Sequence, residues 1–262
     1  MAWVSTVPNA HVFSTKDSYR NHYYWCEHFL DTYGKDHWCV VVDIDELFFY
    51  PNIESVSLKD LCRFLENTNA TAIHSLFLDV YAEQSIAQTP YKQGDNPLNT
   101  LCFFDAQYQE IPYWFMDRYK ATPYFFSVFT GGMRERVFGN DPPPILSKVP
   151  LFKNIGGTYL SQGMHAINDA TLSQLQGVVF HTKFLSDFVN KVEEECQREE
   201  HYNKAMRYKI YQKKLKTAPD IHLYYEGSTK FKDPNQLVEL GLMKTTFEFE
   251  ELAQLTFLDG SK

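Results

Sequence analysis

The segment that most constrains the fold of this chain runs from Trp38 to Pro51 and reads WCVVVDIDELFFYP. Its Val-rich start has no polar alternation, which is typical of a parallel strand covered on both faces. The carboxylates that follow it, Asp43, Asp45 and Glu46, then lie at the rim of the sheet, where ligands bind in open α/β folds. Because Asp43 and Asp45 are two residues apart, both would project to the same side of an extended chain.

The composition is that of a globular protein whose main role is not to coat nucleic acid. Of its 262 residues, 44% are hydrophobic and 16% aromatic, and the formal net charge is −8. Nucleic-acid affinity comes largely from Lys and Arg side chains that neutralise phosphates, so this charge argues against such a partner. The five cysteines form no C-x-x-C pair, which favours reduced thiols in a reducing compartment. With no signal-peptide pattern and no apolar run near the ~18 residues of a membrane span, we expect a cytoplasmic protein without a transmembrane segment.

Hydrophobic periodicity predicts strands that alternate with helices. A helix is expected from Ser18 to Gly34 and a shorter one over residues 60–67. The strands are expected over residues 11–15, 38–42, 71–81, 124–132 and 177–184. This alternation predicts an α/β fold with a mainly parallel sheet flanked by helices. Residues 82–118 have no sustained period, which favours a functional loop.

The character of the chain changes after residue 184. Residues 186–215 are highly charged and contain no Pro or Gly, and the segment 233–242 predicts one more helix that ends at Gly241. We therefore expect a first domain over residues 1–184 and a C-terminal helical extension over residues 185–262 that packs on it.

The D-x-D pair is the first candidate for chemistry. Two converging carboxylates invite a hard divalent cation, Mn²⁺ or Mg²⁺, that bridges to a substrate phosphate. His181 ends the last predicted strand and could complete the metal site, while Lys183 could neutralise phosphate. The alternatives are a strand-end turn whose carboxylates cap backbone amides, and a histidine that is simply hydrogen-bonded at the end of a strand.

Two further places could take part in the same chemistry. Gly131 and Gly132, followed by Arg134 and Arg136, could bring backbone and guanidinium groups close to an anion, or form a plain turn into a solvated helix. His165 lies in a polar loop, where it is either a structural or a functional histidine.

These segments resemble, in order, those of a bacterial subgroup of family 2-like glycosyltransferases with the GT-A fold. The resemblance starts at the D-x-D-E signature of WCVVVDIDELFFYP. It continues through nearly the whole chain, in LDVYAEQ, GDNPL, FDAQY, GGMRERVFG, KVPLFKN, YLSQGMH, GVVFHTKFLSDF, REEHY and LVELGLM.

The resemblance implies a transferase that uses a nucleotide-sugar donor and an acceptor that the sequence does not reveal. By this resemblance, Asp43 lies near the ribose and the metal, and Asp45 holds Mn²⁺ or Mg²⁺ on the diphosphate. The roles of the remaining candidates are also implied: His181 as a metal ligand, Lys183, Arg134 and Arg136 as nucleotide-sugar-binding cations, and His165 or Asp79 as the catalytic base.

The chain departs from this family at its start. Only 42 residues precede Asp43, and the family's D-N-x-S-x-D-G-T-like segment is absent. We therefore expect a GT-A-like domain that is N-terminally truncated. It would be a truncated gene product, a fragment, or a chain whose missing half is supplied elsewhere. Two other functions stay open. One is an inactive GT-A-like binding module, and the other is a haloacid-dehalogenase-like phosphatase, whose D-x-D also follows a Val-rich strand but continues with Thr or Val where Leu47 stands here.

Overall fold

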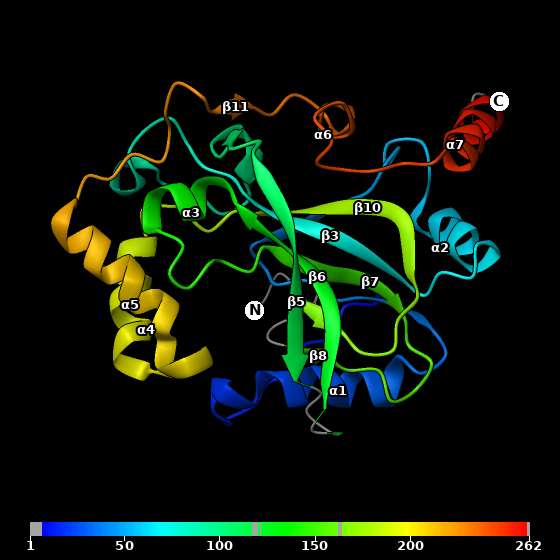
Figure 1. Cartoon of the computed structure of the whole chain (residues 1–262), viewed down its shortest axis with the longest axis horizontal. Helices are drawn as coiled ribbons and strands as arrows, with labels where there is room; N and C mark the ends of the chain where they lie inside the picture. The colour runs from blue at the N-terminus through cyan, green and yellow to red at the C-terminus, as the bar shows by residue number, and fades with distance from the viewer. Residues whose placement is uncertain (1–6, 117–119, 121, 162–163, 261–262) are drawn as a thin grey trace.

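The protein, seen in a computed structural model, is built around one five-stranded sheet (Figure 1). The structure describes residues 7–116, 120, 122–161 and 164–260. In spatial order the strands of the sheet are β1 (Trp38–Val40), β7 (Ser147–Lys153), β3 (Ala72–Asp79), β10 (Leu172–His181) and β2 (Glu46–Phe49).

The sheet is mixed, so the expectation of a mainly parallel sheet is wrong. Only β3 and β10 pair in parallel, while β1 with β7, β7 with β3, and β10 with β2 are antiparallel. The Val-rich run misled the prediction because β1 is an edge strand rather than a covered one, and Val40 and Val42 are both exposed. The α/β class itself is confirmed.

The D-x-D segment connects the two edges of this sheet. Residues 41–45 follow β1 at one edge and lead into β2 at the other. Val41 N–H donates to the Pro150 carbonyl of β7, and Thr182 N–H, just after β10, donates to the Asp45 carbonyl. The segment therefore crosses the sheet close to the end of its central parallel pair.

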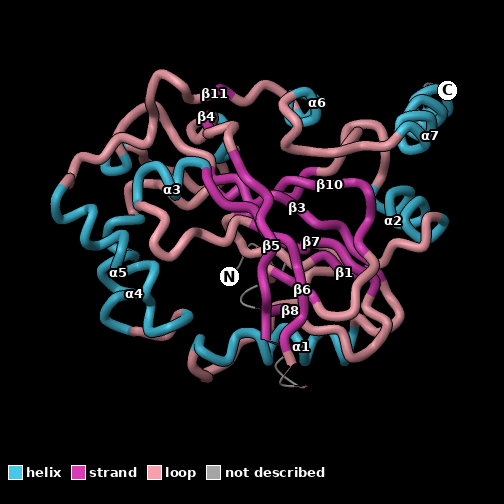
Figure 2. The backbone as a smooth tube through the Cα atoms, viewed as in Figure 1, coloured by secondary structure: helices cyan, strands magenta, loops and turns pink. Residues whose placement is uncertain are grey.

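The helices cover the sheet from several sides (Figures 1 and 2). Helices α4 and α5 lie at one end of the molecule, and α2 and α7 at the opposite end. The helices are α1 (His22–Tyr33), α2 (Leu58–Asn67), α3 (Gly132–Phe138), α4 (Phe188–Arg198), α5 (Tyr202–Thr217), α6 (Pro234–Glu239) and α7 (Phe247–Gly260).

Several predicted elements are confirmed near their expected bounds. Ser18 caps a short 3-10 helix, Tyr19–Asn21, that leads into α1, and Gly34 ends α1. The predicted helix over residues 186–215 is two antiparallel helices, because Glu199 takes a left-handed conformation (φ 51°) and ends α4. The predicted strand at 11–15 is wrong, since these residues have no regular structure.

Part of the predicted irregular region forms strands. β5 (Tyr108–Met116) pairs along its whole length with β6 (Pro123–Gly131) in an antiparallel ribbon that crosses in front of the sheet in Figure 1. The other short strands are β4 (Phe103–Phe104), β8 (Leu160–Ser161), β9 (Ala166–Ile167) and β11 (Thr229–Lys230).

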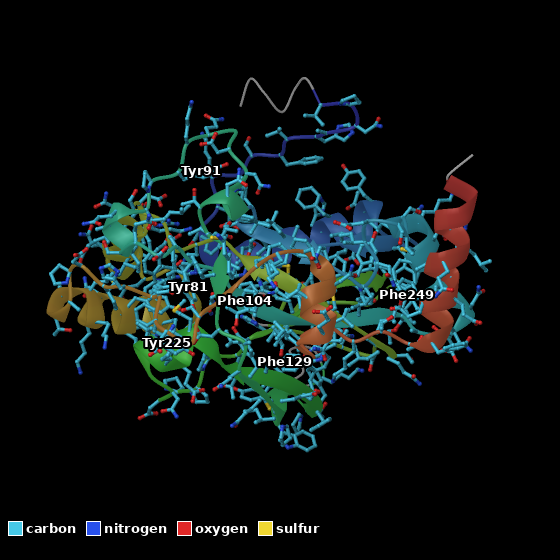
Figure 3. All side chains as sticks on the ribbon, turned by 90° about the horizontal axis from the view of Figure 1, so that it is seen from above. Tyr81, Tyr91, Phe104, Phe129, Tyr225 and Phe249 are labelled. Atoms are coloured by element: carbon cyan, nitrogen blue, oxygen red, sulfur yellow. The ribbon has the colours of Figure 1, made fainter. Side chains whose placement is uncertain are left out.

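The core is divided among the layers that flank the sheet. Phe249 of α7 packs against Phe64 of α2, with ring centroids 4.9 Å apart, and is fully buried; Figure 3 shows it at one end of the molecule. At the other end, α4 and α5 meet through Phe188 and Tyr211. Leu237 of α6 clusters with Phe180 of β10, and Phe249 with Ile73 of β3, so this part of the chain after residue 184 packs on the sheet. In the described part of the chain no helix is long and apolar enough to cross a membrane.

Gly177 of β10 is closely packed against the neighbouring strands, and its replacement by Ala is expected to destabilise the fold. A Cβ at this position would lie 2.6 Å from Ser75 Oγ and 2.9 Å from the Phe49 carbonyl oxygen, which is backbone. Overpacking of this kind costs about 1–3 kcal/mol. Urea unfolding should show this loss for Gly177→Ala but little change for Ser75→Ala, because Ser75 Oγ is buried without a described partner. Unchanged stability in Gly177→Ala would contradict the packing.

Candidate functional site

The central parallel pair brings together two residues of the predicted site. In the register of β3 and β10, Asp79 lies directly beside His181, each at the end of its strand. His181 Nδ1 lies 2.7 Å from Asp79 Oδ1. The Asp79 side chain is fully buried, so this contact is shielded from water.

The other ring nitrogen of His181 faces the D-x-D segment. His181 Nε2 lies 3.5 Å from Asp45 Oδ2. Thr182 fixes Asp45 in place, since both its N–H and its hydroxyl donate to the Asp45 carbonyl, at 2.8 and 3.0 Å. Burial alone would raise the pKa of Asp45, but the hydrogen bond and charge of His181 lower it below its usual range. The predicted association of Asp45 with His181 is therefore present in the fold.

Arg134 closes the chain of contacts behind His181. Its guanidinium pairs with Asp79 in a bidentate way, through Nε at 2.9 Å and a terminal nitrogen at 2.5 Å. Burial would raise the pKa of Asp79, but the charge of Arg134 and the bond to His181 lower it to about 2. His181 Nδ1 lies between the ionised Asp79, which can accept a proton, and a terminal nitrogen of Arg134 at 3.1 Å. This pair of contacts orients the ring so that Nε2 is directed toward Asp45.

The glycine pair before Arg134 serves this contact. Gly132 has φ +60°, and a Cβ there would lie 2.4 Å from the Tyr108 hydroxyl oxygen. Only glycine allows β6 to turn directly into α3 against that ring. The alternative of a plain turn into a solvated helix is wrong for Arg134, which is buried at 8% exposure.

Asp43 does not share a partner with Asp45. Glu46 N–H donates to the Asp43 carbonyl, so the chain turns here instead of staying extended. Lys148 Nζ lies 2.8 Å from Glu46 Oε1 and 3.7 Å from Asp43 Oδ2. The extended conformation that was expected for the D-x-D pair is absent, because the turn pairs Asp43 with Lys148 and Asp45 with His181.

Sequence reasoning missed Lys148 and Phe77. The Phe77 ring forms the floor between the charged groups, 4.5 Å from the His181 ring, 4.9 Å from Lys148 Nζ and 5.3 Å from the Arg134 guanidinium carbon. The negative face of the ring stabilises the positive charges of Lys148 and Arg134. Neither residue was evident from the sequence, because Phe77 is one of several apolar residues in a predicted strand and Lys148 follows a Pro-rich segment.

Lys183 lies beside the site but makes its hydrogen bond elsewhere. Its Nζ donates to the Tyr208 hydroxyl at 2.8 Å and lies 4.4 Å from the centre of that ring. Burial and the charge of Arg134 lower the pKa of Lys183 to about 7. No carboxylate of the described residues accepts a hydrogen bond from this ammonium group, so an added anion would stabilise its charge.

One predicted residue is placed away from this group. Arg136 pairs with Asp105 at 2.7 and 2.8 Å and stacks on the Tyr225 ring at 4.0 Å, where it joins α3 to the chain near β4 and β11. Tyr81 donates to the same Asp105 at 2.5 Å. Figure 3 shows Tyr81 and Tyr225 in this region. Arg136 is thus already neutralised by an internal partner.

His165 is held against β7. Its Nδ1 lies 2.7 Å from the Ser147 carbonyl oxygen, so this nitrogen carries a proton. Burial and the charge of Lys148 lower the pKa of His165 to about 3. The ring is therefore neutral at physiological pH and a weak acceptor of protons.

The donor set partly fits the predicted Mn²⁺ or Mg²⁺. Asp45 Oδ2 and His181 Nε2 offer two donors on one spot, and the buried Asp79 orients the histidine, as outer carboxylates do at metal sites. Among the residues that the structure describes, no group of three or more His, Cys, Asp or Glu side chains is arranged to hold a metal. The fit therefore requires oxygens of a bound phosphate, which is how Mg²⁺ often binds with one or two carboxylates.

No protein family, curated protein or solved structure matches the chain. The function of the site is therefore argued from its own geometry.

Proposed function

We propose that this protein is a metal-dependent glycosyltransferase that transfers a sugar from a nucleoside-diphosphate sugar to an acceptor. The observation that carries the proposal is the chain of contacts from Asp45 through His181 and Asp79 to Arg134. It holds one carboxylate and one imidazole nitrogen at a sheet rim that also carries the cations Lys148 and Lys183. Such a site suits a cation together with a diphosphate.

Each residue has a distinct part in this proposal. Asp45 and His181 would hold Mn²⁺ or Mg²⁺, which stabilises the negative charge of the departing nucleoside diphosphate. Asp43, which is 3.7 Å from Lys148 and has 52% of its side chain exposed, would be accessible to the ribose. Lys183 would add a positive charge near the diphosphate.

Asp79 and the two arginines act in the proposal through other residues. Asp79 is fully buried and ion-paired, which argues against its use as a base and supports a role in positioning His181. Arg134 neutralises Asp79, and Arg136 is paired with Asp105, so neither guanidinium is assigned to the nucleotide sugar.

Binding of a nucleoside diphosphate with Mn²⁺ is expected to raise the melting temperature. A ligand at 100 times its Kd stabilises the folded state by about 2.7 kcal/mol, which corresponds to roughly 5–10 °C for a chain of this size. Differential scanning fluorimetry with UDP, GDP, CDP and dTDP measures it. Asp45→Ala and His181→Ala should abolish the Mn²⁺-dependent part, because each removes one of the two donors.

The controls are variants of exposed residues on α1, Asp31→Ala and His28→Ala, which should keep the full shift. A wild-type protein that shows no shift with any of the four nucleotides would refute the proposed function. A protein that binds but transfers no sugar from any donor would instead be a GT-A-like binding module.

A further inference from the structure

The proposed transfer needs a group that takes the proton of the acceptor, and neither predicted base suits this task. Asp79 is fully buried and its two oxygens are occupied by Arg134 and His181. His165 has one ring nitrogen bound to the Ser147 carbonyl, and its low pKa makes the other a weak base. An effective general base has a pKa near the working pH and a partner that orients it.

The turn between α4 and α5 holds such a pair. His201 Nε2 lies 3.1 Å from Oε2 of Glu195, a carboxylate that is buried at 5% exposure. The other oxygen of Glu195 accepts from Arg198 at 3.0 Å. Nε2 is the ring nitrogen that faces the carboxylate, in an ion-pair contact, while Glu195 Oε2 has no hydrogen bond from another described group. A proton on Nε2 would therefore lie toward Glu195 and leave the Nδ1 lone pair available. The described side chains provide no hydrogen-bond partner for Nδ1, and 27% of the His201 side chain is exposed.

Aromatic rings connect this pair to the D-x-D site. The His201 ring lies 4.8 Å from the ring of Tyr208, whose hydroxyl accepts the hydrogen bond from Lys183. On its other side, His201 lies 4.8 Å from the ring of Tyr19. Burial raises the pKa of Tyr19 to about 12, and the negative charge of Asp43 is the second cause. The Tyr19 hydroxyl is therefore close enough to the D-x-D segment to interact with its charge.

The position of Tyr19 is fixed by the same turn. Its backbone N–H donates to Glu200 Oε2 at 3.1 Å, and Arg20 donates to the Glu199 carbonyl at 3.2 Å. The 3-10 helix before α1 is therefore docked on the turn between α4 and α5. Tyr19 and Tyr208 therefore flank His201, and the Tyr208 hydroxyl connects this group to Lys183.

We propose that His201, oriented by Glu195, is the general base that deprotonates the acceptor. This inference rests on the proposed function. The acceptor hydroxyl gives its proton to Nδ1 as its oxygen forms a bond to the anomeric carbon of the donor sugar. The bond from that carbon to the phosphate oxygen breaks, and its electron pair leaves with the nucleoside diphosphate. Glu195 stabilises the imidazolium ion that results.

The charges around His201 favour a neutral imidazole before the reaction. Burial lowers the pKa of His201, and Glu195 opposes this change. The ionisable groups that face it from the neighbouring elements are Glu195 from α4, Tyr208 from α5, Lys183 after β10, Tyr19 from the 3-10 helix and His22 from α1.

Kinetics of the full chain test the proposal, with water as the acceptor when no natural one is known. Release of nucleoside diphosphate from UDP-, GDP-, CDP- and dTDP-hexoses with Mn²⁺ is measured between pH 5 and 9. His201→Gln should lower kcat by about 10²–10⁴-fold and leave the KM for the donor within about twofold. The substitution should also remove the decrease in kcat at low pH that protonation of His201 causes. Imidazole added to His201→Ala should restore part of the rate, which a purely structural role would not allow.

Two matched controls separate chemistry from folding. Glu195→Gln should lower kcat and shift the acidic limb, whereas Glu194→Gln, one residue away on the exposed face of α4, should do neither. All variants should keep the thermal shift with Mn²⁺ and nucleoside diphosphate, because none of them removes a proposed metal donor.

A measurement that needs no turnover covers the case of a protein that binds but reacts slowly. In protein with ¹⁵N-labelled histidine, the His201 signals should move when the intact nucleotide sugar binds with Mg²⁺, and much less with the nucleoside diphosphate alone. If these signals do not move, or if His201→Gln has the wild-type kcat, His201 is not the general base. The proposed function is unaffected by either result. A wild-type protein that binds none of the nucleotides overturns both.

Discussion

Asp79→Asn is expected to lower the free energy of unfolding by about 3–5 kcal/mol, because it leaves the buried guanidinium of Arg134 without its counter-charge. Arg134 and Asp79 are 9% and 1% exposed at their side chains, so water cannot replace the lost partner. Urea unfolding at pH 7 measures the change. Asp187→Asn, at an exposed position, should cost much less than Asp79→Asn. A loss below about 1 kcal/mol in Asp79→Asn would contradict a charged, water-free pair.

The double variant Asp79→Leu/Arg134→Met is expected to recover most of that stability. Removal of both charges also removes the cost of burying them, so apolar replacements of similar volume are often neutral or stabilising. This variant should still lose Mn²⁺-dependent nucleotide binding, because His181 no longer has the partner that orients it. Recovered stability together with unchanged binding would show that Asp79 has no positioning role.

His74→Phe is expected to reduce the acid sensitivity of the fold. His74 is 7% exposed and stacks on Phe129 with ring centroids 5.0 Å apart, and its Nε2 has no described partner. Burial lowers the pKa of His74 to about 4. The planar Phe ring keeps the stacking but cannot take up a proton.

The sign of this effect follows from the two pKa values. The unfolded chain, with a histidine pKa of about 6.5, binds the proton more readily than the folded one, so stability falls as the pH drops below 6.5 and levels off near 4. Between pH 7.5 and 4.5 the wild type should lose about 2–3 kcal/mol more than His74→Phe in urea titrations. His165 contributes a further loss with the same sign in both proteins. Equal losses in the two would show that His74 is not the buried acid-sensitive group.

The part of the site that the sequence predicted best lies at the ends of strands, where the pairing of the strands brings the predicted residues together. Strand-end positions predicted that Asp45 and His181 would meet at the sheet rim, and the parallel pairing of β3 with β10 brings Asp79 to the same place. The strand β7 was not predicted, because Pro143, Pro144 and Pro150 indicate a loop. Pro150 is tolerated in the strand because it pairs with Val41 through its carbonyl and needs no N–H for this bond.

The burial of Arg134 and the orientation of Asp43 depend on contacts between residues far apart in the sequence, which local sequence patterns do not reveal. Arg134 reaches Asp79 across 55 residues, and a G-G-x-R segment by itself gives no sign that its arginine is buried. The orientation of Asp43 was also unpredictable, because the turn back to Glu46 is stabilised by Lys148 from a strand on the other side of the sheet's centre. Alternation of polar and apolar residues cannot report such partners.

The separation of the site residues along the chain has a consequence for folding kinetics. Asp79 and His181 are 102 residues apart, and Thr182 holds Asp45 from a distance of 137 residues. The entropy of closing such long loops must be lost before these contacts form. We therefore expect the site to be among the last parts of the molecule to assemble, so that in refolding experiments helical signal returns early and Mn²⁺-dependent nucleotide binding returns only with the complete sheet.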